Sequence, residues 1–314
     1  MLASVVLPTR NRPERLRRAL AGLVAQRVTD WEAIVVDDGE GEGIEAVARL
    51  GDPRVAALPS QGQGQVDARA TGFERAQGDI LCWLDDDDWW DDPHHLELLR
   101  DSAAAGAALW FRGGWIVHDG GLREVFDHDA TPESLRVDNT ILTSSIAYPR
   151  RLHAELGPLD RALGGYCDWD FMLRICASGL APHKLPGLGV CYAVHDENVS
   201  KDFANPERLA NFNRFAAKHS LVTTIANHAT MHRRLMDGWD EQDGALQREF
   251  EFDGFAPAIA FVNRVAGLAE AENHHPDIDV RYSKVTLRWT THSEGGITER
   301  DHDLARRSAE LATA

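Results

Sequence analysis

The sequence predicts an α/β domain with a largely parallel sheet, followed by a smaller α+β unit. In about the first 115 residues, short apolar runs alternate with helical patterns, which is typical of strands buried on both faces of a parallel sheet. After about residue 220, apolar residues recur at every second position, as in antiparallel strands covered on one face. A chain of 314 residues is long enough for two such domains.

Four apolar runs define the strands predicted for the first part. They cover residues 4–7, 33–36, 55–58 and 80–84. Between the first two runs, Leu16, Leu20 and Leu23 recur at helical spacing, and Pro13 stands near the expected helix start. Strand, helix and parallel strand in this order form the repeating unit of a doubly wound, Rossmann-like α/β fold.

Polar clusters follow the predicted strands, at the sheet edge where ligands collect in such folds. "PTRNR" follows the first run, "DDGEGEG" the second and "DDDD", residues 85–88, the fourth. Adjacent carboxylates repel one another, and partial burial raises their pKa values further. Such a cluster either forms a solvated turn or receives a cation. Because Mg²⁺ and Mn²⁺ commonly bind carboxylates together with substrate phosphates, we favour a metal-assisted diphosphate site here.

The sequence pattern of the second part predicts an antiparallel sheet with two helices. "ALQREFEF" and "KVTLRWTTH" alternate apolar and polar positions, which indicates strands. Thr298 and Asp301 form a capping-box variant ahead of a final helix. We place the domain boundary in a polar stretch, giving domains at 1–220 and 221–314. The helix between the two strands has one predicted apolar face, made of Phe255, Ile259, Val262, Ala266 and Ala269.

Composition and charge narrow the classes of function. The formal net charge is −17, so neither nucleic acid nor an anionic membrane surface is expected as a general partner. The four cysteines form no Cys-x-x-Cys pair, which argues against a disulfide framework. No segment has the pattern of a signal peptide or the roughly 18 apolar residues of a membrane span. These features predict a cytoplasmic protein.

The motifs of the first part, taken in order over about residues 3–205, resemble those of a known family. They are "PTRNR", "VVDDG", "GDILCWLDDDDWW", "LGPLDRALGGYCDWDFMLRICASG" and "CYAVHDENVSK". The set is similar to the family 2 glycosyltransferases, which have the GT-A fold, with Asp85 and Asp87 matching the family's Asp-x-Asp pair. Cys167 stands where that family usually has Glu. The resemblance implies metal-dependent, inverting transfer of a sugar from a nucleotide sugar, most commonly a UDP-sugar, to an unidentified acceptor.

The same resemblance implies roles for individual residues. Asp87 and His195 are the implied metal ligands, although a strand-end His195 bonded to the backbone is an equal alternative. Asp168 is the implied general base, with Asp170 as the alternative. Asp37 is an alternative to Asp38 for bonding the base or ribose. The residues implied in nucleotide-sugar binding are Pro8, Thr9, Arg12, Asp38, Arg69, Asp85 and Asp86.

Three histidines concentrate in the second part: His274, His275 and His292. Adjacent side chains diverge on a helix or strand, so one metal ion would seldom bind both His274 and His275. Imidazole titrates near neutrality, which makes acid–base chemistry the better chemical hypothesis. The alternative is a helix end whose imidazoles interact favourably with the helix dipole.

The pattern Glu270-x-x-x-His274-His275-Pro276, with Tyr282, His292 and Asp301, resembles the pterin-4a-carbinolamine dehydratases over about residues 225–312. The resemblance implies dehydration of a 4a-hydroxytetrahydropterin, with His274 and His292 as the proton-transfer pair. Asp301 is expected to cap a helix rather than to act in catalysis. Some members serve as dimerisation modules, so a homo-oligomer through this domain is expected. The implied pterin site comprises Glu270, Asn273, His275 and Pro276.

The sequence leaves several hypotheses open. Both domains could be active, the second could only bind a pterin that accepts the sugar, or the second could be a non-catalytic assembly module. A scaffold with two decayed sites is disfavoured because buried, unpaired polar groups are costly to retain. A nucleotidyltransferase would also use a nucleotide and metal-binding carboxylates, but Tyr192-x-x-His195 and "CDWDFMLR" favour sugar transfer.

Overall fold

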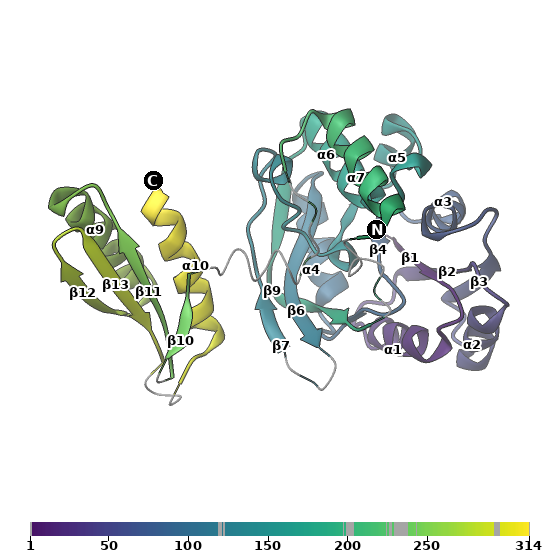
Figure 1. Cartoon of the computed structure of the whole chain (residues 1–314). Coiled ribbons are helices and arrows are strands. Elements are labelled where there is room, and N and C mark those ends of the chain that lie inside the picture. The colour runs from purple at the N-terminus through teal and green to yellow at the C-terminus, as the bar shows by residue number, and fades with distance from the viewer. Residues whose placement is uncertain are drawn as a thin grey trace. The chain divides into compact units, whose positions relative to one another are not determined.

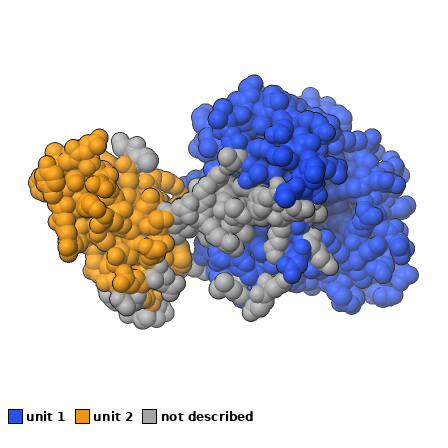
Figure 2. Space-filling model, in the orientation of Figure 1, with its two compact units in different colours: residues 1–229 blue, residues 230–314 orange. Residues whose placement is uncertain are grey.

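The protein is described from a computed structural model. The structure describes residues 2–118, 121, 123–196, 198, 204–223, 225, 228, 238–242, 244–291 and 296–313. Contacts group the chain into two compact units, residues 1–229 and 230–314 (Figure 2), and each has its own hydrophobic core. Within the described ranges, no helix combines the length and apolar character that crossing a membrane requires.

A nine-stranded mixed sheet forms the centre of the first unit (Figure 1). Its strands are β1 (Ala3–Thr9), β2 (Trp31–Asp37), β3 (Val55–Pro59), β4 (Ile80–Trp83), β5 (Trp89–Trp90), β6 (Leu109–His118), β7 (Arg123–Phe126), β8 (Ala147–Pro149) and β9 (Pro182–Val194). The order is β3-β2-β1-β4-β8-β6-β9-β5, and β7 pairs with β6. The first four strands in this order are parallel, as predicted, whereas β8 runs antiparallel to both neighbours.

Helices cover both faces of the parallel half of the sheet. These helices are α1 (Pro13–Val24) and α2 (Glu42–Leu50) on one face and α3 (Gln65–Arg75) on the other (Figure 1). The predicted apolar stripe of α1 is buried, and Pro13 is its first residue. Val6 of β1 packs in one core with Phe73 of α3. The edge strand β3 is partly exposed, unlike β1, because it has a neighbour on one side only.

The other helices described in the first unit surround the second half of the sheet. They are α4 (His95–Ala105), α5 (Arg151–Leu156), α6 (Cys167–Ala177) and α7 (Pro206–His219), with short 3₁₀ turns η1 (Ser134–Arg136), η2 (Thr143–Ser145) and η3 (Arg161–Tyr166). Asn205 caps α7 by accepting hydrogen bonds from the backbone N–H groups of Glu207 and Arg208. Phe212 and Phe215 of α7 join the core that contains Trp169 and Phe171 of α6.

The second unit is an antiparallel sheet with two helices packed against it. Its elements are β10 (Asp240–Gln242), β11 (Ala245–Glu251), α9 (Phe255–Glu272), β12 (Asp277–Arg281), β13 (Lys284–Trp289) and α10 (Glu299–Thr313). The strand order is β10-β11-β13-β12. Val285, Leu287 and Trp289 are fully buried, which confirms the predicted alternation of β13.

The predicted apolar face of α9 is correct at Ala269, but otherwise it is shifted by about one position. The buried residues are Ala258, Phe261, Val265 and Ala269, whereas Phe255 is 53% exposed. Apolar residues occur on several sides of this helix, so the spacing alone supports two neighbouring faces. Contact of Phe261 with Phe250 of β11 selects the observed one.

Candidate active sites

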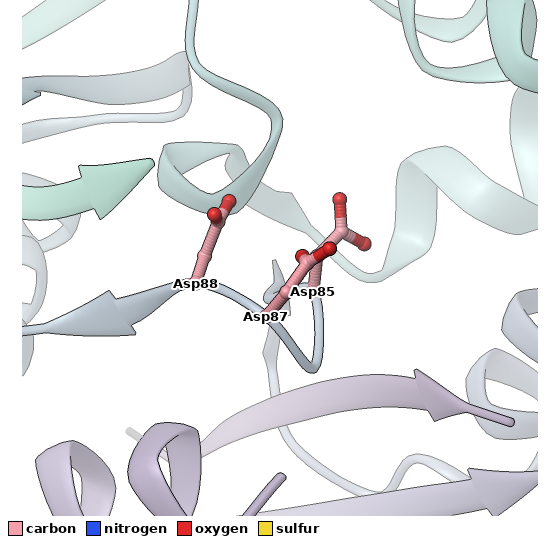
Figure 3. A group of neighbouring side chains, drawn as sticks. All are labelled: Asp85, Asp87 and Asp88. Atoms are coloured by element: carbon pink, nitrogen blue, oxygen red, sulfur yellow. The ribbon is translucent and has the colours of Figure 1, made fainter. Parts of the chain in front are cut away.

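The loop that follows β4 carries four consecutive aspartates, and three of them project to the same side of it (Figure 3). One carboxylate oxygen from each of Asp85, Asp87 and Asp88 lies within 4.8 Å of the other two. Asp88 is buried, whereas Asp85 and Asp87 are half-buried. Carboxylate oxygens at this spacing suit a hard divalent cation.

Two segments that are distant in the sequence, residues 9–12 and His195, converge on Asp86 and Asp87. Thr9, at the end of β1, donates a hydrogen bond from Oγ1 to Asp86 Oδ2 (2.7 Å). Arg12 Nη1 lies 3.1 Å from Asp87 Oδ2 and 3.5 Å from Asp86 Oδ1. His195, directly after β9, places Nε2 3.0 Å from Asp87 Oδ2. The two predicted metal ligands, Asp87 and His195, are therefore direct neighbours.

The carboxylate of Asp88 is held in place by hydrogen bonds at both of its oxygens. Asp88 Oδ2 accepts from Ser144 Oγ (2.5 Å), and Oδ1 accepts from the backbone N–H of Ala193 (2.8 Å). Ser144 Oγ also accepts from the backbone N–H of Asp85 (3.0 Å). Since Asp88 is 1% exposed, these bonds fix the direction in which this carboxylate points.

Burial and mutual repulsion make it costly for all four aspartates of this loop to be ionised. Burial raises the pKa of Asp86 to about 7, and the neighbouring Asp87 adds to the effect. Burial, Asp87 and Asp85 together raise the pKa of Asp88 well above its usual range. Burial alone would raise the pKa of Asp87 too, but the hydrogen bond with His195 and the charge of Arg12 outweigh it and lower that pKa. A bound divalent cation would relieve this repulsion, so the residues present fit such an ion.

Arg69 of α3 lies buried beside the same loop. It forms an ion pair with Asp85 and is 2% exposed, and its guanidinium carbon lies 4.6 Å from the Trp83 ring centroid. Its Nε and Nη1 atoms have no hydrogen-bond partner among the described residues. Burial raises the pKa of the nearby Cys167 thiol to about 12, so Cys167 offers Arg69 no negative charge at neutral pH.

The two aspartates at the end of β2 have different environments. Asp37 is 4% exposed and accepts hydrogen bonds from the backbone N–H groups of Gly39 (2.8 Å) and Gly43 (2.7 Å), which caps the start of α2. Asp38 accepts one from the backbone N–H of Gly64 (2.8 Å). Asp38 therefore keeps more acceptor capacity than Asp37. Pro8 is buried in β1, directly before Thr9.

Asp168 and Asp170, both in the first turn of α6, also differ. Asp168 Oδ2 accepts a hydrogen bond from Thr143 Oγ1 (2.7 Å), and its charge acts on both Arg69 and Asp85. Asp170 is fully buried and pairs with three side chains that can carry positive charge. These are Lys218 and His219, each 2.8 Å from Oδ1, and Arg174, 3.0 Å from Oδ2.

In the second unit, the adjacent histidines have separate carboxylate partners. His274 Nε2 lies 2.7 Å from Asp301 Oδ1, and its ring stacks on Trp289 with 5.7 Å between centroids. His275 Nε2 lies 3.1 Å from Glu270 Oε1, and both of these side chains are exposed. His274 is thus fixed inside the unit, whereas His275 is accessible to a ligand.

Asp301 combines two roles. Its Oδ2 accepts hydrogen bonds from the backbone N–H of Thr298 (2.7 Å) and from Thr291 Oγ1 (2.7 Å), so the predicted cap at the start of α10 is confirmed. The contact of Asp301 with His274 was not foreseen. Asn273 ends α9 in the left-handed conformation, with φ 49°, and Pro276 precedes β12. His292 lies outside the described residues.

Several residues at the acidic loop were missed by sequence reasoning. Ser144 belongs to no motif and stands 56 positions from Asp88, so only the folded chain brings the two together. Thr143 was missed for the same reason. Arg18 carried a usable signal, because Arg15 and Arg18 are three positions apart and therefore share one side of α1, with Arg12 directly before the helix.

Comparison with known families divides the chain in two. Residues 4–152 match the family described as "Glycosyl transferase family 2", and residues 220–311 match "Pterin 4 alpha carbinolamine dehydratase". A Thermomicrobium roseum protein named "Putative pterin-4-alpha-carbinolamine dehydratase" is 59% identical over 76 residues, which is 24% of this chain and 82% of that protein.

Solved structures resemble the first part of the chain in fold. S. aureus TarS in complex with UDP-GlcNAc superposes with a TM-score of 0.57 at 15% identity, covering 69% of this chain and 66% of that chain. The mannosyltransferase PcManGT from Pyrobaculum calidifontis, in complex with GDP-Man and Mn²⁺, gives 0.53 at 18% identity, covering 73% and 67%. These matches, the mixed sheet and the family models lead to one assignment. The chain joins a glycosyltransferase family 2 domain with the GT-A fold to a domain that belongs to the pterin-4a-carbinolamine dehydratase family.

Proposed function

We propose that the first domain transfers a sugar, with inversion, from a nucleotide diphosphate sugar to a hydroxyl acceptor, assisted by Mn²⁺ or Mg²⁺. The second domain would dehydrate a 4a-hydroxytetrahydropterin. The boundary between the two domains in the sequence would lie near residue 220. The cluster of Asp85, Asp87 and Asp88 within 4.8 Å, at the end of β4, carries the first proposal. Structures of similar fold that contain UDP-GlcNAc, or GDP-Man with Mn²⁺, support it.

The ends of β1 and β2 would bind the nucleoside of the donor. The proposed nucleoside site would be lined by Pro8, Thr9 and Arg12. Asp38 would accept hydrogen bonds from the base or ribose. Asp38 is preferred to Asp37 because Asp37 already accepts backbone hydrogen bonds from Gly43 and Ile44 in the first turn of α2. Arg69 would orient Asp85 next to the nucleotide, since the two form a buried ion pair. A UDP-sugar is our first choice of donor.

Asp87 and His195 would hold the metal, with Asp85 and Asp88 as neighbouring carboxylates and Asp86 toward the ribose. When bound, the metal neutralises charge on the departing diphosphate. The chain itself fixes the carboxylates, because Ser144 and the Ala193 backbone bond Asp88 while Arg12 bonds Asp87. Little reorganisation is then needed during the reaction.

Asp168 would be the general base. As the acceptor oxygen forms its bond to the anomeric carbon and the bond to the diphosphate breaks, Asp168 would take the hydroxyl proton. Thr143 orients this carboxylate by donating a hydrogen bond to Oδ2 (2.7 Å). Asp170 is a poorer candidate because its carboxylate is fully buried and paired with Arg174, Lys218 and His219.

Hydrolysis of UDP-glucose, UDP-GlcNAc and GDP-mannose, with and without Mn²⁺, tests sugar transfer. We expect Mn²⁺-dependent release of UDP or GDP, and an Asp168→Asn variant about 10²–10⁴-fold slower that still binds the donor. Asp101→Asn, an exposed change of the same kind on α4, is the matched control. If the wild-type chain released no nucleotide from a broad donor panel, the proposed transfer would be wrong.

In the second domain, His274 would exchange a proton with the pterin while Asp301 orients its ring. His292 would be the second proton-transfer group. The exposed pair of His275 and Glu270 would position the pterin, with Asn273 and Pro276 beside it. The 59% identity to the Thermomicrobium roseum protein supports this assignment.

Dehydration of a 4a-hydroxytetrahydropterin, followed by absorbance, tests the second domain. His275→Ala should raise KM, whereas His183→Ala, at an exposed position of β9, should change nothing. A wild-type chain without dehydratase activity would favour the alternative in which this domain joins copies of the chain. Sedimentation velocity of the full chain tests the proposed homo-oligomer.

A further inference from the structure

An open cavity of about 310 Å³ lies beside the acidic loop, between α1 and the ends of β6 and β9. It shares His195 with the acidic site, because His195 both lines the cavity and contacts Asp87. Its lining residues are Glu14, Arg15, Arg18, Val117, His118, Ala193 and His195.

One side of α1 contributes positively charged side chains to the cavity. Arg15 and Arg18 are one helical turn apart and both line it. Arg18 Nη2 donates to the backbone carbonyl of Asp87 (2.6 Å), and its guanidinium carbon lies 3.8 Å from the Trp89 ring centroid. Arg18 is thus positioned by a neutral carbonyl and an aromatic ring, and no carboxylate of the described residues forms an ion pair with it.

Among the described residues that line the cavity, Glu14 is the one acid, and both Glu14 and the lining residue His118 are already paired. The Glu14 carboxylate forms an ion pair with Arg17 of the same helix. Glu124 of β7 lies 2.5 Å from His118 Nε2. The wall that α1 contributes thus carries two arginines, Arg15 and Arg18, against one glutamate that pairs with Arg17.

We propose that Arg15 and Arg18 bind the diphosphate of the nucleotide donor in this cavity, so that α1 shares the charge of the leaving group with the metal. This inference rests on the proposed sugar transfer. Arg12 directly precedes α1 and bonds Asp87, and Arg15 and Arg18 follow on the helix and line the cavity. Arg18 also donates to the Asp87 backbone carbonyl, which links the cavity to the acidic loop. Guanidinium groups match phosphate oxygens in geometry and charge.

An acceptor-borne phosphate is the less favoured occupant of the cavity. The acceptor hydroxyl has to reach Asp168, whose hydrogen-bond donor Thr143 does not line the cavity. A diphosphate near four aspartates would also be repelled without cations of the chain. Arg15 and Arg18 would offset part of this repulsion.

Calorimetric titration of the full chain in MnCl₂ with UDP, GDP, uridine, guanosine and inorganic pyrophosphate tests this inference. Replacing both arginines, Arg15→Gln with Arg18→Gln, should weaken binding of the diphosphates at least about tenfold and leave nucleoside binding unchanged. Replacing both with Lys should restore part of the affinity. Arg49→Gln on α2, where Arg49 pairs with Glu45 on the surface, is the control. Circular dichroism and Tm verify folding.

Two results separate failure of the inference from failure of the proposed function. Unchanged affinity of the folded double Gln variant for UDP or GDP would overturn the inference alone. If the wild-type chain bound neither UDP nor GDP, the proposed sugar transfer would be wrong. Pyrophosphate would then test the arginines by itself, and equal binding by both chains would refute an anion site at these arginines.

Discussion

Asp86 gives a quantitative test of the electrostatics proposed for the acidic loop. Burial and Asp87 raise its pKa from 3.8 to about 7, a difference of about three pH units. At 1.36 kcal/mol per unit, this corresponds to a cost of about 4 kcal/mol for ionised Asp86 in the folded, metal-free protein. Asp86→Asn removes this cost, and its Oδ1 can still accept the hydrogen bond from Thr9.

The sign of the pH dependence follows from proton binding. Between pH 4 and pH 7 the folded state holds a proton on Asp86 that the unfolded state has released, so wild-type stability falls as pH rises through this window. The stability of the Asn variant should not fall in this way, because its side chain carries no titratable proton. Because the variant also loses the contact of Arg12 with Asp86, we expect a net gain of about 1–3 kcal/mol at pH 8 and little difference at pH 4.

Urea unfolding in EDTA at pH 4 and pH 8, followed by tryptophan fluorescence, measures this difference. Of the nine tryptophans, all except Trp239 and Trp289 lie in the first unit, so the signal reports mainly on that unit. Asp101→Asn, on the surface of α4, should leave the pH dependence unchanged. Ionised Asp86 would not be costly in the folded protein if Asp86→Asn destabilised the metal-free protein at pH 8, or if the variant kept the wild-type pH dependence.

Three further predictions concern residues that stabilise the two units or orient their site residues. Asp170→Asn should destabilise the first unit by about 3 kcal/mol in urea, because it removes the buried charge to which Arg174, Lys218 and His219 bond; a loss below about 1 kcal/mol would contradict this. Asp301→Asn should lower the kcat for pterin dehydration at least about tenfold while far-UV circular dichroism stays unchanged, and full activity would rule out its positioning role. Phe261→Ala should destabilise the second unit by about 3–5 kcal/mol, as seen in its Tm, whereas Phe255→Ala at the exposed helix start should cost far less.

The strands and the acidic loop could be predicted because their signals are local. Apolar runs mark β1, β2 and β4, and the carboxyl ends of parallel strands meet at one edge, which placed the DDDD segment near Thr9 and Arg12. The alternation in β13 likewise follows from one buried face.

The remaining details depend on contacts that no local pattern encodes. Asp168 and Asp170 differ because Lys218 and His219 reach Asp170 from α7, about 50 positions away. The orientation of the Asp88 carboxylate likewise depends on a hydrogen bond from Ser144, which is distant in the sequence. The buried face of α9 is decided by Phe250 on a strand, which the helix sequence cannot show.

The most direct test of the account is a crystal of the full chain soaked with MnCl₂ and UDP or GDP, with data collected at the manganese absorption edge. We expect an anomalous peak within bonding distance of Asp87, beside Asp85 and Asp88, with the diphosphate next to it. Bound nucleotide with no anomalous peak at these carboxylates would contradict metal-assisted sugar transfer.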